Sequence, residues 1–516
     1  MTRDISSDAM NSFAELSPVD GAKLDLVVTT SLQELPAMVE RAKQAQRAWA
    51  GLAVAERARA FSNVRDHVMD RGEELASLIH REVGKPEAEA LLGEVLATGD
   101  VLSFWIEHIE EHLEDLELEI DPISYPSKRG RIIREPRGVL GVIMPWNFPL
   151  ALPFRTLVPA LLAGNAVIFK PSEISPRTGA LVVELFRGLP EGVLQLLQGG
   201  GEHGAALCSS GVDLVVFTGS VATGRKVAHA CAERLIPCSL ELGGKDAAIV
   251  LADANLDRAA HGIVWGALMN AGQNCGAVER VYVERKVADA FTQKVVEIAK
   301  ELRPGIDVGP LTTKAQCEIV RDHVEDAKAQ GAEVLLGGNS AVGGYEYPVT
   351  IARVERDDVR LIADETFGPV LPILVVETAE EAVARANASR YGLTASIWTK
   401  NYTLAKKLGA QIRAGVVTIN NHSFTGALAN APWTGVGESG YGVTNSIHAL
   451  EAYTRPKLYL EDRNSQKREL WWFPYTPHLK TIALSFLVLR SGTKSVFVKM
   501  GAVFRLLGAF LKRWKT

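Results

Sequence analysis

The first third of the chain carries apolar residues at helical spacing. Leu35, Met38, Val39 and Ala42 repeat every three or four positions, and longer runs of the same kind cover residues 53–82 and 87–116. A stripe of apolar residues with this period predicts amphipathic helices over residues 31–115.

The spacing then changes to alternation. Leu116, Leu118 and Ile120 alternate with acidic residues, and a second short apolar segment, 130–133, follows a proline-containing turn. This period of two predicts a two-stranded hairpin near residues 116–136.

From Gly138 to about Asn420, short apolar runs rich in β-branched residues alternate with helical segments. The expected strands include 139–144, 166–169, 193–197, 214–217 and 247–251. Apolar strands separated by helices predict a mostly parallel sheet wrapped on both faces. The expected fold class is therefore α/β.

Composition narrows the class of protein. The 516 residues suffice for two or three domains, 47% are apolar, and the net charge of −5 comes without a basic block in the body, so nucleic-acid binding is not expected. Five cysteines without a CxxC or Cys/His pattern predict no disulfide scaffold and no metal site, and favour a reducing, cytoplasmic compartment. The polar N-terminus, residues 1–16, does not read as a signal peptide.

The segment from Ala271 to Gly276 places Cys275 just after a Gly-Gln pair and before an apolar run at 281–283. Backbone N–H groups in such a turn can point at one spot, as a nucleophilic cysteine requires for the oxyanion it creates. The alternative is an inert cysteine used for packing.

A second candidate is Asn147, which lies between Pro145 and Pro149 in the segment 145–149. The two prolines restrict the backbone, so the side-chain amide can be held in one direction as an oxyanion donor. The alternative is an aromatic-rich turn that fills a core.

Two segments after expected strands fit a dinucleotide. Lys170, Ser172 and Glu173 follow the strand at 166–169, where a lysine and an acid could bind ribose hydroxyls, and the acid would disfavour a 2′-phosphate. Gly219 and Gly224 lie where the next strand enters a helix, a place that suits an anion. Ordinary strand–helix loops remain the alternative for both.

Two acids are further candidates. Glu241 stands beside the glycine pair 243–244 and is either a solvated loop charge or a general base with room for water. Glu365, with Phe367 two residues later, could contact a second ribose and a nicotinamide, or could belong to a plain turn.

Taken together and in this order, these motifs resemble the aldehyde dehydrogenase superfamily over residues 30–460. The segments 432–436 (PWTGV) and 438–442 (ESGYG) look like that family's C-terminal signature. The resemblance implies that Cys275 attacks the aldehyde, that the Asn147 amide and the Cys275 N–H hold the oxyanion, and that Glu241 activates the water that hydrolyses the thioester. Members that use coenzyme A usually lack the acid at Glu241, so release of a free carboxylate is expected.

The same resemblance implies NAD as cofactor, with NADP left open. It assigns the cofactor contacts to Trp146, Lys170, Ser172, Glu173, Gly219, Ser220, Gly224, Leu242, Glu365 and Phe367.

The implied architecture is a Rossmann-like cofactor domain (1–115 and 137–242), an α/β catalytic domain (243–428) and a bridging hairpin with oligomerisation segments (116–136 and 429–462). A strand after residue 450 is expected to join the hairpin. Homodimers or homotetramers are the family habit.

The substrate is less determined. Arg155 lies eight residues after Asn147, where succinate-semialdehyde dehydrogenases and several aromatic-aldehyde members carry an arginine, and it could bind a substrate carboxylate. The alternative is a helix-surface or interface charge. The leading hypothesis is an NAD-dependent aldehyde dehydrogenase that releases a carboxylic acid, with a hydrophobic or long-chain aldehyde as one candidate substrate. A semialdehyde dehydrogenase, an acylating enzyme that uses coenzyme A and a non-catalytic relative are the other interpretations.

The tail, residues 463–516, extends beyond the usual family end. From Leu470 onward it has eight bases and no acid, a formal charge of +8. Since the whole chain carries −5, the residues before Leu470 carry a formal charge of −13. One helical face carries Val496, Met500, Val503, Leu507, Phe510, Leu511 and Trp514, with Lys494, Arg505 and Lys512 opposite. A basic amphipathic helix suits the inner face of an anionic membrane, and docking on the enzyme itself or on a partner subunit is the alternative.

Overall fold

The computed structural model describes residues 12–13, 16–122, 124–339, 344–422 and 424–515. The prediction that residues 1–16 are not a signal peptide falls largely on residues 1–11, which lie outside the described residues. The described chain divides into two units, a body (1–114 and 134–457) and a smaller unit (115–133 and 458–516).

The body begins with the expected helices, because the apolar stripes of the sequence find partners. Leu75, Ile79 and Val83 of α3 are 0–1% exposed, and Gly84, with φ +83°, ends that helix in the left-handed conformation. The block comprises α1 (Leu35–Ala50), α2 (Val54–Asp70), α3 (Gly72–Val83), α4 (Glu87–Ala90), the π-helical η3 (Leu91–Leu96) and α5 (Ala97–His112).

A five-stranded, wholly parallel sheet follows, in the order β7-β6-β5-β8-β9. Its strands are β5 (Val139–Ile143), β6 (Ala166–Lys170), β7 (Leu194–Leu196), β8 (Leu214–Thr218) and β9 (Cys238–Glu241), and its helices are α6 (Ala151–Leu162), α7 (Pro176–Leu185), α8 (Gly201–Ser209) and α9 (Val221–Arg234). All residues of β5, β6 and β8 are buried, as the apolar runs predicted.

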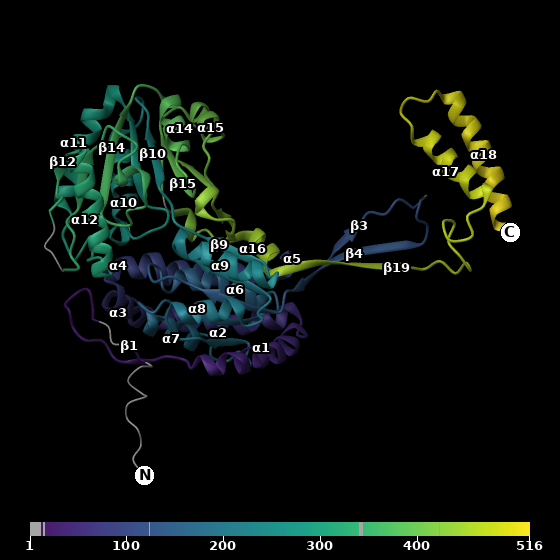
Figure 1. Cartoon of the computed structure of the whole chain (residues 1–516), viewed down its shortest axis with the longest axis horizontal. Coiled ribbons are helices and arrows are strands. Elements are labelled where there is room, and N and C mark those ends of the chain that lie inside the picture. The colour runs from purple at the N-terminus through teal and green to yellow at the C-terminus, as the bar shows by residue number, and fades with distance from the viewer. Residues whose placement is uncertain (1–11, 14–15, 123, 340–343, 423, 516) are drawn as a thin grey trace, which may run out of the picture. The chain divides into compact units, whose positions relative to one another are not determined.

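A seven-stranded sheet has the order β12-β13-β14-β11-β10-β15-β16, and only β12 is antiparallel to its neighbour. Its strands are β10 (Asp246–Val250), β11 (Val278–Glu284), β12 (Glu333–Leu336), β13 (Thr350–Arg353), β14 (Val370–Val376), β15 (Thr394–Trp398) and β16 (Val416–Ile419). Its helices are α10 (Leu256–Leu268), α11 (Ala288–Glu301), α12 (Lys314–Ala329), α13 (Arg360–Ala363), α14 (Ala379–Asn387) and α15 (Tyr402–Gly409) (Figure 1). The later helix α16 (Ser446–Tyr453) packs instead against α6, in the core of the five-stranded sheet. The α/β prediction is confirmed.

The predicted hairpin is also present. β3 (Leu116–Leu118) pairs antiparallel with β4 (Lys128–Pro136), and β19 (Thr454–Asp462) joins β4 on its other side. Shorter elements are β1 (Ser12–Phe13), β2 (Val27–Val28), β17 (Trp433–Thr434) and β18 (Val443–Thr444), with 3-10 turns η2 (Leu32–Glu34), η4 (Met269–Gly272), η5 (Arg285–Val287), η6 (Phe424–Ala427) and η7 (Gly437–Ser439).

The tail contains two helices where the sequence pattern predicted one. α17 (Pro477–Arg490) precedes α18 (Val496–Lys515), and the two pack against each other (Figure 1). No described helix combines the length and the apolar character needed to cross a bilayer.

Candidate active site

The loop that carries Cys275 is held in an unusual backbone shape. Asn270 and Ala271 both have φ of +54°, a conformation that side chains disfavour. Buried side chains hold it: Asn270 Nδ2 donates to the Gln273 carbonyl at 3.0 Å, and Gln273 Oε1 accepts from Thr312 N–H at 2.9 Å. Several buried polar side chains therefore fix the backbone just before the cysteine.

Cys275 itself lies half-buried in the turn between η4 and β11. Its Sγ is 3.8 Å from Asn274 Oδ1, and its backbone N–H donates to no described residue. Burial raises the pKa of the thiol to about 12, the carboxyls of Asp246, Glu241 and Glu365 add to that rise, and Arg155 opposes it. The thiol therefore needs a proton acceptor before it can act as a nucleophile.

Asn147 is brought to the same loop from the turn between β5 and α6. Its Nδ2 donates to the Gln273 carbonyl at 3.1 Å, and its own carbonyl accepts from Asn270 Nδ2 at 2.8 Å. The side chain is 3% exposed. Because Nδ2 carries two N–H bonds, one can fix the amide while the second remains as a donor.

Glu241 is the last residue of β9 rather than a loop residue, and this strand was not among those expected from the sequence. It is 4% exposed, and neither carboxyl oxygen has a partner among the described residues. Burial raises its pKa well above the ordinary value, and Arg155 opposes the shift. The interpretation of Glu241 as a solvated charge is therefore wrong.

The C-terminal signature lies against this strand. Leu242 N–H donates to the Ser439 carbonyl at 3.1 Å, and Ser439 Oγ donates to the Gly243 carbonyl at 2.7 Å. Segments nearly 200 positions apart in the sequence thus fix the backbone around Glu241.

Two cavities meet at the cysteine. One, of about 590 Å³, is lined by Cys275, Asn274 and Arg155; the other, of about 320 Å³, is lined by Cys275, Asn147 and Glu365. Cys275 is the side chain that both share, so its sulfur can be reached from two directions.

The smaller cavity contains most of the predicted cofactor residues. Its lining includes Trp146, Gly219, Ser220, Leu242, Glu365 and Phe367. Glu365 accepts from Gly244 N–H at 3.0 Å, and a Cβ on Gly243 would overlap its carboxylate, so a larger residue there would displace the Glu365 side chain. Burial, with Glu279 next in effect, raises the pKa of Glu365 to about 8.

Four predicted cofactor residues do not line that cavity: Lys170, Ser172, Glu173 and Gly224. Lys170, at the end of β6, pairs with Glu173 at 3.0 Å, and Ser172 is 7% exposed. Gly224, in the first turn of α9, faces Leu242 so closely that a Cβ would meet its side chain at 2.5 Å.

The larger cavity is mainly apolar. Aliphatic and aromatic side chains form most of its lining, among them Leu92, Leu152, Val264, Trp265, Leu268, Met269, Ile298, Leu302, Ile306, Val308, Phe424 and Trp433. Arg155 extends into it from α6, and its Nε is buried without a partner among the described residues. The hypothesis that Arg155 is a surface charge is therefore wrong.

Sequence reasoning missed the acids behind this cavity. Glu89 lines it, has one carboxyl oxygen without a partner among the described residues, and has its pKa raised by burial. Glu94 pairs with buried Lys85 and accepts from Leu150 and Ala151 N–H at the start of α6. Both acids come from the first helical block, and no local motif marked them.

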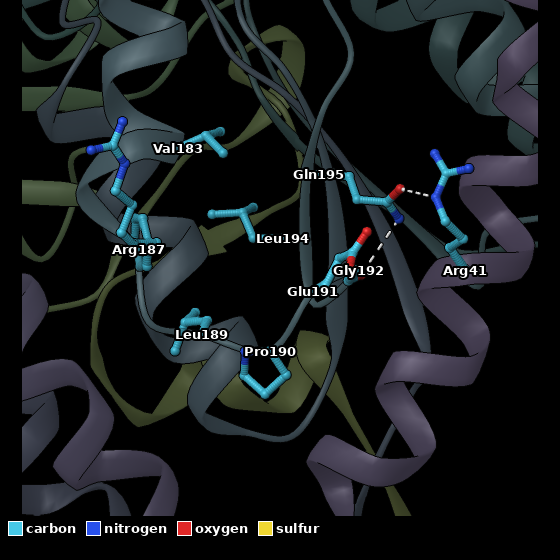
Figure 2. A pocket seen from close by; sticks show the side chains of 10 residues that line it. Arg41, Val183, Arg187, Leu189, Pro190, Glu191, Gly192, Leu194 and Gln195 are labelled. Carbon is cyan, nitrogen blue, oxygen red and sulfur yellow. Dashed lines mark hydrogen bonds between the residues drawn. The ribbon is translucent and has the colours of Figure 1, made fainter.

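A third pocket, of about 400 Å³, has different chemistry (Figure 2). Arg41, Arg187 and Glu191 lie around it, and Arg41 Nε donates to Gln195 Oε1 at 3.3 Å. It contains no candidate nucleophile, so the two cavities that meet at Cys275 are the candidate active site.

This chain is similar in sequence and structure to known proteins. A family model described as the aldehyde dehydrogenase family matches residues 5–459. A 4,4'-diapolycopene aldehyde oxidase from Methylomonas sp. is 36% identical over 473 residues, 90% of this chain and 89% of the relative.

Two solved structures are similar over nearly their whole length. An aldehyde dehydrogenase from Bacillus cereus, solved with NAD+, is 33% identical with a TM-score of 0.84, covering 88% of this chain and 94% of that one. An E. coli enzyme described as NADP dependent is 31% identical with a TM-score of 0.85, covering 88% and 95%. The helices α17 and α18 lie beyond the residues that the family model matches.

Proposed function

The chain belongs to the aldehyde dehydrogenase family, and on that premise we propose that it oxidises an apolar aldehyde to a carboxylic acid with NAD(P)+. The observation that carries the proposal is the position of Cys275 where an apolar cavity and a second, more polar cavity meet. An aldehyde can approach the sulfur from the first while an oxidant waits in the second.

The covalent step uses Cys275 as nucleophile. The thiol loses its proton to Glu241, directly or through water, and the sulfur bonds to the aldehyde carbon. The oxygen becomes an oxyanion that accepts from the remaining Asn147 Nδ2–H and from the Cys275 N–H, both without another described acceptor.

The smaller cavity fits a dinucleotide, as its glycine-lined approach and the half-buried Glu365 indicate. Glu365 and Phe367 would hold the nicotinamide end, and Trp146 and Leu242 would line the cavity beside it. The phosphates would be held by Gly219, Ser220 and Gly224. The adenosine ribose would be held by Lys170, Ser172 and Glu173. When bound, the oxidised nicotinamide supplies the acceptor for the hydrogen and electron pair that leave the aldehyde carbon. NAD is favoured by Glu173, and NADP is left open.

Glu241 completes the reaction. Cys275 is left as a thioester, and Glu241 releases the thiol's proton to solvent. Water then attacks the acyl carbon as the Glu241 carboxylate takes its proton, and the carbon–sulfur bond breaks to return the thiolate. Both unpartnered carboxyl oxygens of Glu241 support this role.

A panel of aldehydes tests the proposal. Nicotinamide reduction is followed by absorbance with NAD+ and NADP+, with and without coenzyme A, for the full chain and for Cys275→Ser. We expect turnover without coenzyme A, a preference for long apolar aldehydes, and a loss on the order of 10³-fold or more in the variant. Cys317→Ser, at another buried cysteine, is the matched control.

Two results would contradict it. Turnover that requires coenzyme A would indicate an acylating enzyme, and a folded protein without turnover on any aldehyde would indicate a non-catalytic relative.

A second candidate substrate, an aldehyde that carries a carboxylate, is favoured by Arg155. Its guanidinium reaches an apolar cavity, and its Nε has no described partner. If a semialdehyde is the substrate, Arg155→Met raises KM for it by about 10²-fold, because a desolvated charge pair is lost, and spares neutral aldehydes. An equal effect on both classes would leave the apolar aldehyde as the substrate.

Domain roles, assembly and location follow from the same premise. We propose that residues 1–115 and 137–242 bind the cofactor, that 243–428 carry the nucleophile, and that 116–136 and 429–462 pair subunits in a cytoplasmic homodimer or homotetramer. Leu116 of β3 and Leu458, Tyr459 and Leu460 of β19 are each 51–56% exposed, which supports burial by a second copy. We also propose that residues 463–516 contact the inner face of a membrane. Sedimentation velocity of the purified chain tests the assembly, and a monomer would contradict it.

A further inference from the structure

The α17–α18 hairpin packs through small residues. Ile482 and Ser485 of α17 and Ala502 and Ala509 of α18 are 0–6% exposed. Ala502 and Ala509 are seven residues apart and share one face of α18. The fully buried face of the hairpin is therefore narrow, and most of the larger apolar side chains of α18 lie outside it.

Those larger side chains form a continuous exposed stripe on α18. Phe497 is 86% exposed, Phe504 72% and Leu511 66%, at intervals of seven residues along one side of the helix. Val496, Met500, Val503 and Leu507 lie beside them and are 40–71% exposed. An exposed apolar surface of this length marks an interaction site.

Further exposed apolar residues belong to the same part of the chain. Leu484 and Leu487 of α17 and Trp472, Phe473 and Tyr475 of the preceding linker are all more than half exposed. Tryptophan and tyrosine are the residues that settle at membrane–water interfaces, where a ring can lie among headgroups.

Charge argues against a second copy of the hairpin as the surface that covers this stripe. From Leu470 to the end there are eight bases and no acid, so two copies of this hairpin would repel each other. A bilayer with anionic headgroups offers both the opposite charge and an apolar layer beneath it.

We propose that the α17–α18 hairpin lies on an anionic bilayer, with the exposed stripe of α18 immersed at the acyl boundary. The helix lies in the membrane plane, because no described helix is suited to crossing. Lys499, next to the stripe, and Arg505, across the helix from it, add attraction to the headgroups. The consequence for catalysis rests on the proposed function: apolar aldehydes dissolved in the bilayer would be concentrated at the enzyme.

Vesicle flotation of the full chain tests the docking surface without reference to activity. The probes are phosphatidylcholine vesicles with or without about one-third phosphatidylglycerol, a fraction chosen to give a strongly anionic surface. We expect at least about tenfold stronger binding to the anionic vesicles, and weaker binding as salt is raised.

The double variant Phe497→Asp/Phe504→Asp should lose at least about tenfold in vesicle binding, since it places charge in the stripe. Both positions are exposed, so folding is expected to survive. The matched control is Tyr402→Asp, an aromatic residue of α15 that is 60% exposed, which should bind as the parent does.

Several results would overturn the inference. The first is equal vesicle binding by the parent and the double variant, and the second is equal binding to neutral and anionic vesicles. The third is a smaller assembly of the double variant in sedimentation, which would mean that the stripe joins copies of the chain. Turnover of a short, water-soluble aldehyde is measured in parallel. Turnover without vesicle binding defeats the docking alone, and vesicle binding without turnover defeats the proposed reaction alone.

Discussion

Helices α3 and α18 are both amphipathic, yet only one has its apolar side covered. Leu75 and Ile79 of α3 are fully buried, whereas Phe497 and Phe504 of α18 are 86% and 72% exposed. The pattern along a helix thus states which side is apolar, while burial depends on whether the rest of the molecule provides a partner surface. In the body that surface comes from neighbouring helices and sheets, whereas the smaller unit, to which α18 belongs, leaves the apolar side of this helix exposed.

Buried polar groups show the reverse contrast. In the smaller unit, buried Glu469 is paired with Lys128 and accepts from Asn464 at 3.0 Å. In the body, Glu241, Asn147 Oδ1 and Arg155 Nε are buried without described partners, all near Cys275. Unpaired buried polar atoms are costly, and those of Glu241, Asn147 and Arg155 are among the ones that substrate, water or cofactor would satisfy in the proposed site.

The largest expected effect places the same charge on the two helices. Leu75→Asp in α3 should lower the free energy of unfolding by about 3–5 kcal/mol, because an unpaired carboxylate enters a core. Phe504→Asp in α18 should change it by less than about 0.5 kcal/mol, as for an exposed site. Urea unfolding of both variants measures this, and equal losses would mean that the stripe of α18 is covered after all.

Glu241→Gln probes the unpaired groups directly. A fall in kcat of about 10²–10⁴-fold is expected, with acyl-enzyme accumulating on Cys275, because the base for hydrolysis is lost. Burial raises the Glu241 pKa, so the reactive carboxylate forms only at higher pH than for an ordinary carboxyl, and kcat of the parent should climb as pH rises through that raised pKa. Pre-steady-state bursts measured across a range of pH test both effects. If kcat of the variant still rises with pH as in the parent, Glu241 is not the base.

Asn147→Ala should lower kcat/KM by about 10²–10³-fold, the usual cost of one oxyanion donor. Because Nδ2 also holds the Gln273 carbonyl at 3.1 Å, a modest fall in stability is expected too. Kinetics and urea unfolding on the same preparation separate the two. Loss of stability with unchanged kcat/KM would leave Asn147 as a purely structural residue.

The smallest expected effect comes from ending the chain before Pro477, which removes α17 and α18. Turnover of a water-soluble aldehyde should stay within about twofold and the melting temperature within about 2 °C, because the core of the body does not include these helices. Calorimetry and steady-state kinetics check this. A large fall in either quantity would show that the body depends on the tail.

The sequence determined most elements of the fold, because burial of a helix or strand leaves a local period in its residues. The stripes of residues 31–115, the alternation at Leu116 and Leu118, and the apolar runs of β5, β6 and β8 all became the expected structures. The strand β9 and the helix α17 were not predicted from the sequence. The strand is only four residues long, and the apolar residues of the helix do not keep to one face. The family followed from motifs read in order, which depends only on residue identity.

Only the tertiary structure decided which distant residues come together. Nothing local to Glu241 says that its carboxyl is buried, nothing near Arg155 says that it reaches the cavity of Cys275, and nothing in α3 or α18 says which apolar side will find a partner. Residues far apart in the chain settle these matters, since desolvation, charge and packing act through space and leave no mark on the spacing of neighbours.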